Sequence, residues 1–528
     1  MTDSRAQHSR YAAIFALGTM LSRVLGLVRE IVVTYFIPVA AFDAFVVAFR
    51  LPNMLREIVG EGATNAAFVP VFSERLEKKS KLEFQRLVAA AFGVMIILLL
   101  VMTVVGMLLL PYLLSAMHVL DTFTQTGPVA PERVGYMTHL SLLTFPYLFL
   151  IGLAVFCAAP LYVLHHYSTP SWTPALLNVA IIATCLLAHD AFADPAYALI
   201  AGVWLGGVAQ LAAQYAAMGR IAGVWAPRFD FSDPGIRRVF LLLVPVIFGQ
   251  AAGEVNRLVG TLFAAGLPTG TVRSLYLADR LVQLPLSVFG VATSIAILPT
   301  LAKSRARGAT DEVRTVLLNG LRQSFFLTVP AMAGLVVLAQ PIVQLMYERG
   351  QFDAAATQMT STAVVIYALG LLSFAWLKVC VTGFYAAQNT RIPVVIASAS
   401  MLLNILLNFV LVGPFGFKGL AIATTFSFTL NAVFLYALLW KRVGPLYDSE
   451  FVFALIRMLC AAALMAGVAW VVHNRLEAVL GDETLLSRAI ATLSAITAGA
   501  IAYAALCRAM AVPELDAFAR ALSRRFHS

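Results

Sequence analysis

The stretch "SRVLGLVRE" (Ser22–Glu30) places two arginines and a glutamate inside a run of apolar sequence. Apolar residues flank it on both sides, over residues 11–21 and 31–38. An arginine at the centre of a membrane helix costs about 2.5–3.5 kcal/mol on insertion scales, and more in simulations. If this stretch crosses a membrane, its arginines need water or charged partners at membrane depth.

The composition indicates a polytopic membrane protein, because 60% of the 528 residues are hydrophobic and only 12% are charged. A membrane helix needs about 20 mostly apolar residues. Each such run is expected to be helical, since an open sheet edge cannot satisfy its backbone in lipid. We therefore predict an all-α fold with fourteen transmembrane helices, which begin near residues 11, 42, 87, 136, 174, 196, 236, 271, 313, 356, 392, 417, 451 and 485.

Basic residues in the loops orient these spans. Cytoplasmic loops of membrane proteins carry an excess of Lys and Arg. The excess lies in the loops that are cytoplasmic when the N-terminus is inside, which predicts that both termini are cytoplasmic. The net charge of +10 is thus read as a topology signal rather than as a sign of nucleic-acid binding. The largest group follows the second span: Arg75, Lys78, Lys79, Lys81 and Arg86.

The second span repeats the opening pattern, because "RLPNMLRE" (Arg50–Glu57) has the same R-x5-R-E spacing. Six residues of an ideal helix turn through about 600°, so the two arginines of a pair lie about 120° apart. A bend at Gly26 or at Pro52 would bring both toward one side. Asp43 and the neighbours Asp279 and Arg280 add further charge at membrane depth.

An excess of guanidinium groups in a shared aqueous cleft suits a dianionic ligand. The planar fork of arginine binds phosphate oxygens bidentately and stays charged. A phosphate-bearing substrate is therefore predicted for Arg23, Arg29, Arg56 and Arg280. The alternative is that these arginines pair with acids to hold helices together, using Glu30, Asp43, Glu57 and Asp279.

Signatures of enzymes are missing from the sequence. It holds no HExxH, GxSxG or GxxxxGK[ST] motif, and no Asp-Asp pair suited to magnesium on a polyprenyl diphosphate. We therefore expect a transporter without metal or cofactor. A membrane-embedded glycosyltransferase would need such an acidic cluster, and an exporter of cationic drugs would need an excess of carboxylates.

Several motifs, taken together, resemble the MurJ/MviN family of lipid II flippases. These motifs are "SRVLGLVRE", "DAFVVAFRLPNMLREIVGEGATNAAFVPVF", "LYLADRLVQLPLSVFGVATSIAILPTLAKS", "LMYERGQFDAAAT" and "GFYAAQNTRIPV". The family belongs to the multidrug/oligosaccharidyl-lipid/polysaccharide exporter superfamily. The likeness spans nearly the whole chain.

The resemblance implies two pseudo-symmetric six-helix bundles around a central cavity, over residues 1–228 and 229–442. Residues 443–528 would add two helices that form a groove for the lipid tail, followed by a cytoplasmic tail. The cavity arginines of the family fall on Arg23, Arg29, Arg56 and Arg280 by motif match. Asp43 and Asp279 match its cavity aspartates, and Glu30, Glu57 and Arg50 are expected to balance the cavity charge.

The function that the resemblance implies is flipping of lipid II by alternating access for cell wall biosynthesis and cell shape. Lipid II is undecaprenyl-diphosphate-MurNAc-pentapeptide-GlcNAc, and it would move from the cytoplasmic to the periplasmic leaflet of the bacterial inner membrane. We expect a monomer whose partners are lipid II, membrane lipids and cell-wall synthesis proteins, with no nucleic acid. A flippase for another polyprenyl-linked glycan is the main alternative.

The sequence departs from the family pattern at two places. Gln283 stands where relatives often carry Glu, which removes a carboxylate from the expected cavity. Gly260 and Thr261 occupy the place of an acidic residue that relatives use in a proposed sodium site. Asn404, Asn408 and Thr424 could supply the polar part of such a site, and the alternative for them is hydrogen bonding between helices.

Overall fold

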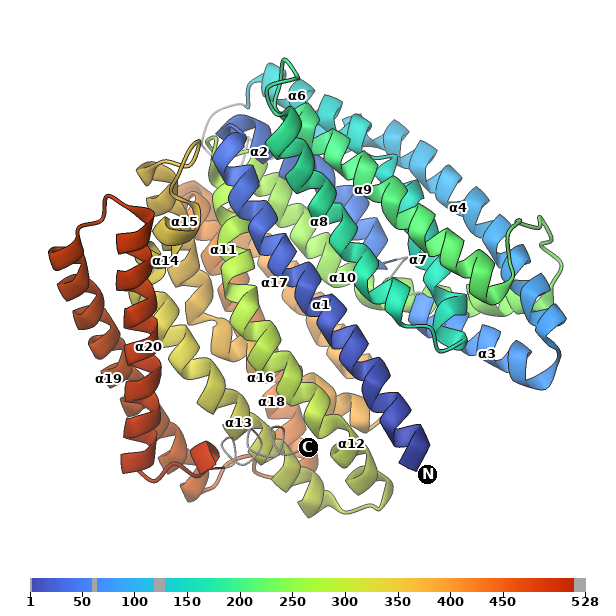
Figure 1. Ribbon diagram of the computed structural model, residues 1–528. Helices are drawn as coiled ribbons and strands as arrows, with labels where there is room; N and C mark the ends of the chain where they lie inside the picture. The colour runs from blue at the N-terminus through green and yellow to red at the C-terminus, as the bar shows by residue number, and fades with distance from the viewer. Residues whose placement is uncertain (1, 59–63, 118–128, 517–528) are drawn as a thin grey trace. The chain divides into compact units, whose positions relative to one another are not determined.

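The computed structural model describes residues 2–58, 64–117 and 129–516 (Figure 1). All regular secondary structure in these ranges is helical, which confirms the predicted all-α class. Part of the second quoted motif, residues 59–63, and the end of the expected cytoplasmic tail, residues 517–528, lie outside the described residues.

The first of two compact units holds residues 1–273 and 349–351. Within it, α8 packs along both α1 and α9, and the three helices run side by side in Figure 1. Gly18 makes the close approach of α1 to α8 feasible, since a Cβ atom there would lie 2.6 Å from the carbonyl oxygen of Ser171. The helices are α1 (Thr2–Phe36), α2 (Val39–Leu55), η2 (Thr64–Phe68), α3 (Val69–Lys78), α4 (Lys81–Ser115), α6 (Pro131–Thr144), α7 (Tyr147–Val163), α8 (Ser168–Ala188), α9 (Ala196–Ala217), η3 (Met218–Ala222) and α10 (Pro234–Ala265).

Ion pairs tie the start of α10 to α3 within this unit. Arg75 Nη2 lies 2.5 Å from Asp233 Oδ1, the cap of α10. Arg238 pairs with Glu74, which also accepts a hydrogen bond from Lys78 at 2.9 Å. Hydrogen bonds from Lys78 and Arg238 lower the pKa of Glu74. The helix that opens the predicted second bundle is therefore anchored to the first compact unit.

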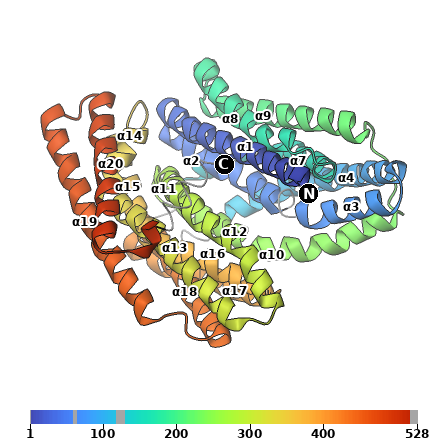
Figure 2. The same ribbon diagram turned by 60° about the horizontal axis from the view of Figure 1, so that its bottom comes forward.

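The second compact unit holds residues 274–348 and 352–528. Its last two long helices, α19 and α20, form a pair joined by a short turn and lie side by side in both ribbon views (Figures 1 and 2). The helices are α11 (Thr271–Pro285, which begins in the first unit), η4 (Leu286–Val291), α12 (Ala292–Ala306), α13 (Thr310–Val337), α14 (Ala339–Tyr347), α15 (Ala354–Leu369), α16 (Leu371–Ala386), α17 (Arg391–Phe415), α18 (Phe417–Val443), α19 (Ser449–Leu480) and α20 (Leu485–Ala509).

A partly buried arginine, Arg322 on α13, joins this helix pair to α13. Arg322 Nε donates to Glu514 Oε1, just after α20, at 2.5 Å. Its Nη1 lies 3.2 Å from Oε1 of Glu450 at the start of α19. Tyr503 Oη adds a hydrogen bond to the carbonyl oxygen of Phe326 at 2.9 Å. Arg322 thus serves helix packing, through acids that flank both added helices.

Ten helical stretches among the described residues are long and apolar enough to cross a membrane. An eleventh is gained if α15 and α16, which meet at a bend of 42°, form one span. The other three predicted spans fall on α1, α2 and α10, which carry in-span charges. The chain is a multi-pass helical membrane protein. The count of fourteen and the division at residues 228 and 442 stay predictions.

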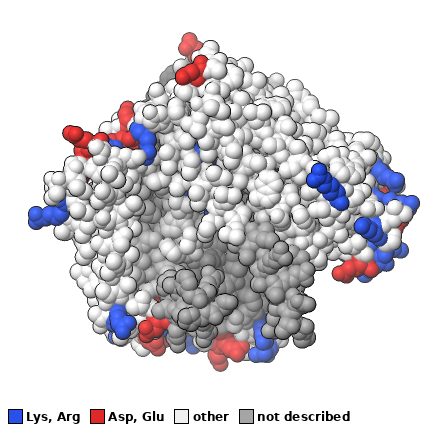
Figure 3. Space-filling view, in the orientation of Figure 1, with Lys and Arg blue, Asp and Glu red and all other residues white. Residues whose placement is uncertain are grey.

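The surface agrees with contact to lipid. On the face drawn in Figure 3, the charged side chains of the described residues gather toward the helix ends, and a broad uncharged area lies between them. Large apolar side chains are exposed in both units, among them Leu108, Leu187 and Leu486. Exposed apolar surface on this scale is typical of a membrane-facing protein.

Candidate functional site

Arg29 on α1 is held in place by α8. Its Nη1 donates to Oδ1 of Asn178 at 3.0 Å, and its Nη2 pairs with Glu30 next to it. Asn178 is itself fixed, since its Nδ2 donates to the carbonyl oxygen of Ser22 at 3.0 Å. The Arg29 side chain retains 15% exposure. One edge of the guanidinium group is thus positioned by the protein, and the side chain still reaches the surface.

Arg23 lies on the same helix and is exposed. Helix α1 runs from Thr2 to Phe36 without a break at Gly26. The two arginines of the opening stretch therefore have different surroundings, as expected from their angular separation of about 120° on a helix. Arg29 is bound to α8, whereas the side chain of Arg23 is exposed.

The end of α2 carries a second group of charges. Pro52 lies inside this helix, which ends at Leu55. Arg56 Nε donates to Asn53 Oδ1 at 3.1 Å, and Asn53 Nδ2 donates to Glu57 Oε1 at 2.8 Å. Arg56 Nη2 also lies 3.6 Å from Glu57 Oε1. Asn53, which the sequence interpretation passed over, orders this arginine and this acid.

Helix α10 extends this group into a mixed cluster of charges. Arg257 Nη1 lies 3.3 Å from Glu57 Oε2, and its Nη2 lies 3.1 Å from Glu254 Oε1. Arg50 Nη2 lies 3.7 Å from Glu254 Oε2. We name the set of Arg50, Arg56, Glu57, Glu254 and Arg257 the α2–α10 cluster. The cluster contains three arginines and two acids, so its guanidinium groups outnumber its carboxylates.

Asp43, whose part in the charge balance of the cavity stays a prediction, is bonded to the start of α11 in the first unit. It is fully buried, and its carboxylate accepts hydrogen bonds from the backbone N–H groups of Gly270 at 2.6 Å and Arg273 at 2.7 Å. These groups lie at the start of α11, where a carboxylate is favoured by the helix dipole. Arg133 Nη2 lies 3.7 Å away. Asp43 caps a helix.

Arg273 is a buried charge that the sequence analysis did not single out. Its side chain is among the largest that are fully buried, and its Nη1 donates to the carbonyl oxygen of Gln351 at 3.2 Å. Gln351 N in turn donates to the carbonyl oxygen of Tyr35 at the end of α1. Gly270, at φ +98°, supplies the left-handed turn before α11. In the sequence, this glycine beside a short polar run was the feature that could have indicated the turn.

In the second unit, Arg280 and Asp279 are both exposed on α11. Arg280 Nη2 donates to Tyr276 Oη at 3.3 Å, and its guanidinium lies 5.0 Å from the centre of the Tyr276 ring. Gln283 Nε2 donates to Asp279. The glutamine at position 283 therefore bonds to the aspartate one helical turn before it.

The polar residues of α17 and α18 bond to one another. Asn408 Nδ2 donates to Asn404 Oδ1 at 3.2 Å, Asn404 Nδ2 to Thr424 Oγ1 at 3.4 Å, and Thr424 Oγ1 to the carbonyl oxygen of Leu420 at 3.0 Å. Both asparagines are buried. This arrangement supports the alternative of hydrogen bonding between helices.

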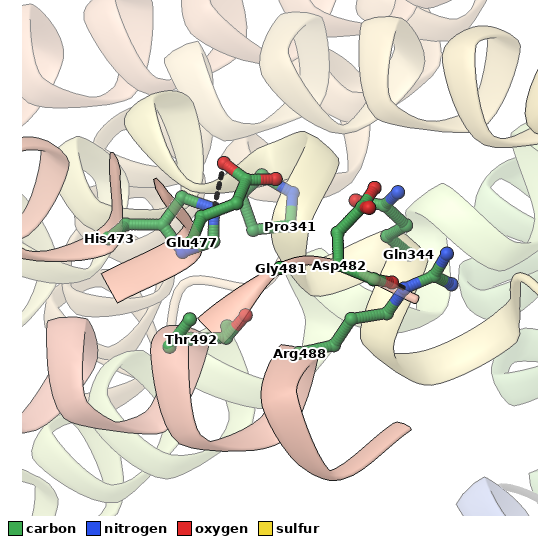
Figure 4. A pocket seen from close by; sticks show the side chains of 9 residues that line it. Pro341, Gln344, His473, Glu477, Gly481, Asp482, Arg488 and Thr492 are labelled. Atoms are coloured by element: carbon green, nitrogen blue, oxygen red, sulfur yellow. Dashed lines mark hydrogen bonds and ion pairs between the residues drawn. The ribbon is translucent and has the colours of Figure 1, made fainter. Parts of the chain in front are cut away.

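A small pocket in the second unit lies at the turn between α19 and α20 (Figure 4). Arg488 crosses it, with Nη2 at 3.2 Å from Glu348 Oε1 and Nε donating to the carbonyl oxygen of Asp482 at 2.6 Å. His473 Nε2 lies 3.6 Å from Glu477 Oε2. None of the predicted site residues lines this pocket. Its ionic contacts fasten α14 to the helix pair.

Comparison with known proteins places the chain in a family. A profile described as "Lipid II flippase MurJ" matches residues 32–488. A protein of Haemophilus influenzae named probable lipid II flippase MurJ is 35% identical over 86% of this chain and 90% of its own length. A protein of Vibrio cholerae with the same name is 34% identical over 85% of this chain and 86% of its own length.

Solved structures agree on the fold. A structure of lipid II flippase MurJ in an inward closed conformation has a TM-score of 0.74 at 22% identity, over 94% of this chain and 99% of that one. An inward-facing multidrug resistance MATE family transporter of the MOP superfamily has a TM-score of 0.64 at 14% identity, over 82% of this chain and 98% of that one. With the profile match over most of the sequence and two relatives above 30% identity, the chain belongs to the lipid II flippase MurJ family.

Proposed function

We propose that this protein is a lipid II flippase of the bacterial inner membrane. It moves the undecaprenyl-diphosphate-linked peptidoglycan precursor from the cytoplasmic to the periplasmic leaflet and leaves the lipid chemically unchanged. Relatives that carry this name over nearly their whole length support the proposal. It acts as a monomer with both termini in the cytoplasm.

The observation that carries the proposal is the partial exposure of three arginines on α1 and at the end of α2. Arg23, Arg29 and Arg56 all keep part of their surface exposed on α1 and at the end of α2. In hydrocarbon each would cost several kcal/mol, so we place them in water. A diphosphate matches this set, because each guanidinium offers two parallel N–H groups to phosphate oxygens.

The chain prepares these groups before the substrate arrives. Asn178 and Glu30 already orient Arg29, and Asn53 already orients Arg56. Ordered side chains lose less conformational entropy on binding, which strengthens the interaction with the diphosphate. Arg280 supplies the same chemistry in the second unit, where Tyr276 steadies it.

Transport follows if the diphosphate favours a state in which the substrate-binding arginines are shielded from the cytoplasm. A ligand shifts such an equilibrium only by its differential affinity for the two states. Neutralising the cluster of positive charges supplies that difference, because repulsion among arginines opposes closure when the substrate is absent. The apolar tail stays in contact with lipid or with the α19–α20 pair.

The test is complementation of a cell depleted of its lipid II flippase. Wild type is expected to restore growth, and Arg29→Ala is expected to fail at equal expression, because its diphosphate contact is lost. Arg391 is a basic residue at the start of α17 and lies outside the predicted site. The Arg391→Ala variant serves as the matched control and should restore growth. Wild type that does not rescue contradicts the lipid II assignment, and full rescue by Arg29→Ala contradicts the phosphate-binding role.

A further inference from the structure

Arg257 joins two acids from different helices with one guanidinium fork. Its Nη1 faces Glu57 at 3.3 Å and its Nη2 faces Glu254 at 3.1 Å. Both nitrogen atoms that would form a bidentate contact with a phosphate group are therefore occupied by carboxylates. A carboxylate pair and a phosphate group present oxygen atoms to the fork in similar ways.

The position of Arg257 is unusual for a merely structural ion pair. It lies eight residues before the end of α10 at Ala265, or about 12 Å inside the helix at 1.5 Å per residue. Its side chain is nevertheless 51% exposed. An arginine with half its surface in hydrocarbon at this depth would be costly, so its open side is expected to face water.

The two acids that contact Arg257 are more buried than Arg257 itself. Glu254 is 5% exposed, and its Oε2 is buried without a hydrogen bond from any described residue, with Arg50 Nη2 at 3.7 Å. Glu57 is bound by Asn53 at 2.8 Å and lies near Arg56. Removal of Arg257 from the α2–α10 cluster would thus leave each acid with one cationic neighbour.

We propose that Arg257 is a further substrate-binding residue, which Glu57 and Glu254 hold ready and release to the diphosphate of the substrate. This inference rests on the proposed function. The acids act as internal competitors: they position the guanidinium in the empty protein and lower its apparent affinity for phosphate. Substrate binding then exchanges two carboxylate contacts for phosphate contacts on the same nitrogen atoms.

The energies allow this exchange. Water screens an ion pair whose partner is largely exposed, so such a pair contributes little. A hydrogen bond between charged groups contributes more when the complex is less exposed. Replacing the first by the second is favourable, and the released acids keep partners, since Glu254 stays near Arg50 and Glu57 stays bonded to Asn53.

The experiment measures binding of undecaprenyl diphosphate to the full-length protein in lipid nanodiscs. Arg257→Ala is expected to weaken binding about tenfold or more. The affinity of Arg257→Lys should lie between those of wild type and Arg257→Ala, because lysine keeps the positive charge and lacks the two parallel N–H groups of the guanidinium. Glu254→Gln should tighten binding about threefold, since one competitor is removed while the shape of the side chain is kept.

A double-mutant cycle separates this mechanism from a general effect of charge. In the Arg257→Ala background, Glu254→Gln should produce no gain. Glu77→Gln removes the same charge from an exposed position on α3 of the same unit, and it should leave affinity unchanged. An equal gain from Glu254→Gln in both backgrounds would overturn the proposal, as would a gain from Glu77→Gln.

The proposed function and this inference fail in different ways. Wild type that does not bind undecaprenyl diphosphate would contradict the proposed function. Wild type that binds, with weakened binding by Arg29→Ala and unchanged binding by a stable Arg257→Ala, would overturn only the role of Arg257. The thermal unfolding midpoint of each variant shows that it is folded, and Arg257→Lys replaces the alanine variant if that protein unfolds.

Discussion

Two charged networks of the first unit contain the same residue types and differ in burial. Around Asp43, the carboxylate and the Arg273 side chain are buried and bonded to backbone groups of α11 and of residue 351. In the α2–α10 cluster, Arg257 is half exposed and its partners are side chains. The first network fixes chain segments to one another, whereas our proposal has the second exchange its partners for a ligand.

The largest effect is expected from breaking the buried network with Asp43→Ala. The change leaves the N–H groups of Gly270 and Arg273 without the Asp43 carboxylate as acceptor and removes the buried charge that pairs with Arg133. Loss of one partner from a buried charged network costs about 3–5 kcal/mol. Thermal unfolding in detergent should show a strongly lowered midpoint. An unchanged midpoint would contradict the structural role of Asp43, and Asp190→Ala at an exposed site is the control.

A smaller effect is expected from Asn178→Ala, which removes the support of Arg29 and keeps the arginine. The loss of one hydrogen bond to a charged group should weaken binding of undecaprenyl diphosphate about fivefold or more. Binding measurements on the purified protein check this value. If Asn178→Ala binds as wild type does while Arg29→Ala does not, the orientation supplied by α8 is unimportant.

The smallest effect is expected from Glu57→Gln in the open cluster. The amide oxygen still accepts the hydrogen bond from Asn53, and the ion pair with Arg257 is partly screened by water. Stability should change by less than about 1 kcal/mol. A drop in the unfolding midpoint comparable with that of Asp43→Ala would show that the cluster holds the fold together, which would remove the contrast between the two networks.

Hydropathy and charge cost were sufficient to predict a polytopic helical protein and to select Arg23, Arg29, Arg56 and Arg280. These signals are local, because a helix hides its own backbone and each in-span charge needs its own compensation. The residues that contact these charges could not be predicted from the sequence. Asp43 meets Gly270 across 227 positions, and Arg29 meets Asn178 across 149. The periodicity of a single helix does not predict a contact between residues so far apart in the sequence.

The same limit applies to the surroundings of Asp43, Arg273 and Arg257. Asp43 matches a cavity aspartate by motif, and its burial and its backbone partners depend on the turn before α11. The burial of Arg273 was not predicted, since only the fold brings residue 351 against it. Arg257 and Glu254 lie three residues apart on α10, whereas the pairing of Arg257 with Glu57 depends on the packing of α2 against α10.

The most direct test of the central claim is translocation of lipid II by the purified protein in liposomes. Wild type should move lipid II across the bilayer, and the Arg29→Ala/Arg280→Ala variant should fail to do so while keeping the unfolding midpoint of wild type. Arg391→Ala should transport as wild type does. Translocation at the wild-type rate by the double variant would contradict the claim that these arginines bind the diphosphate.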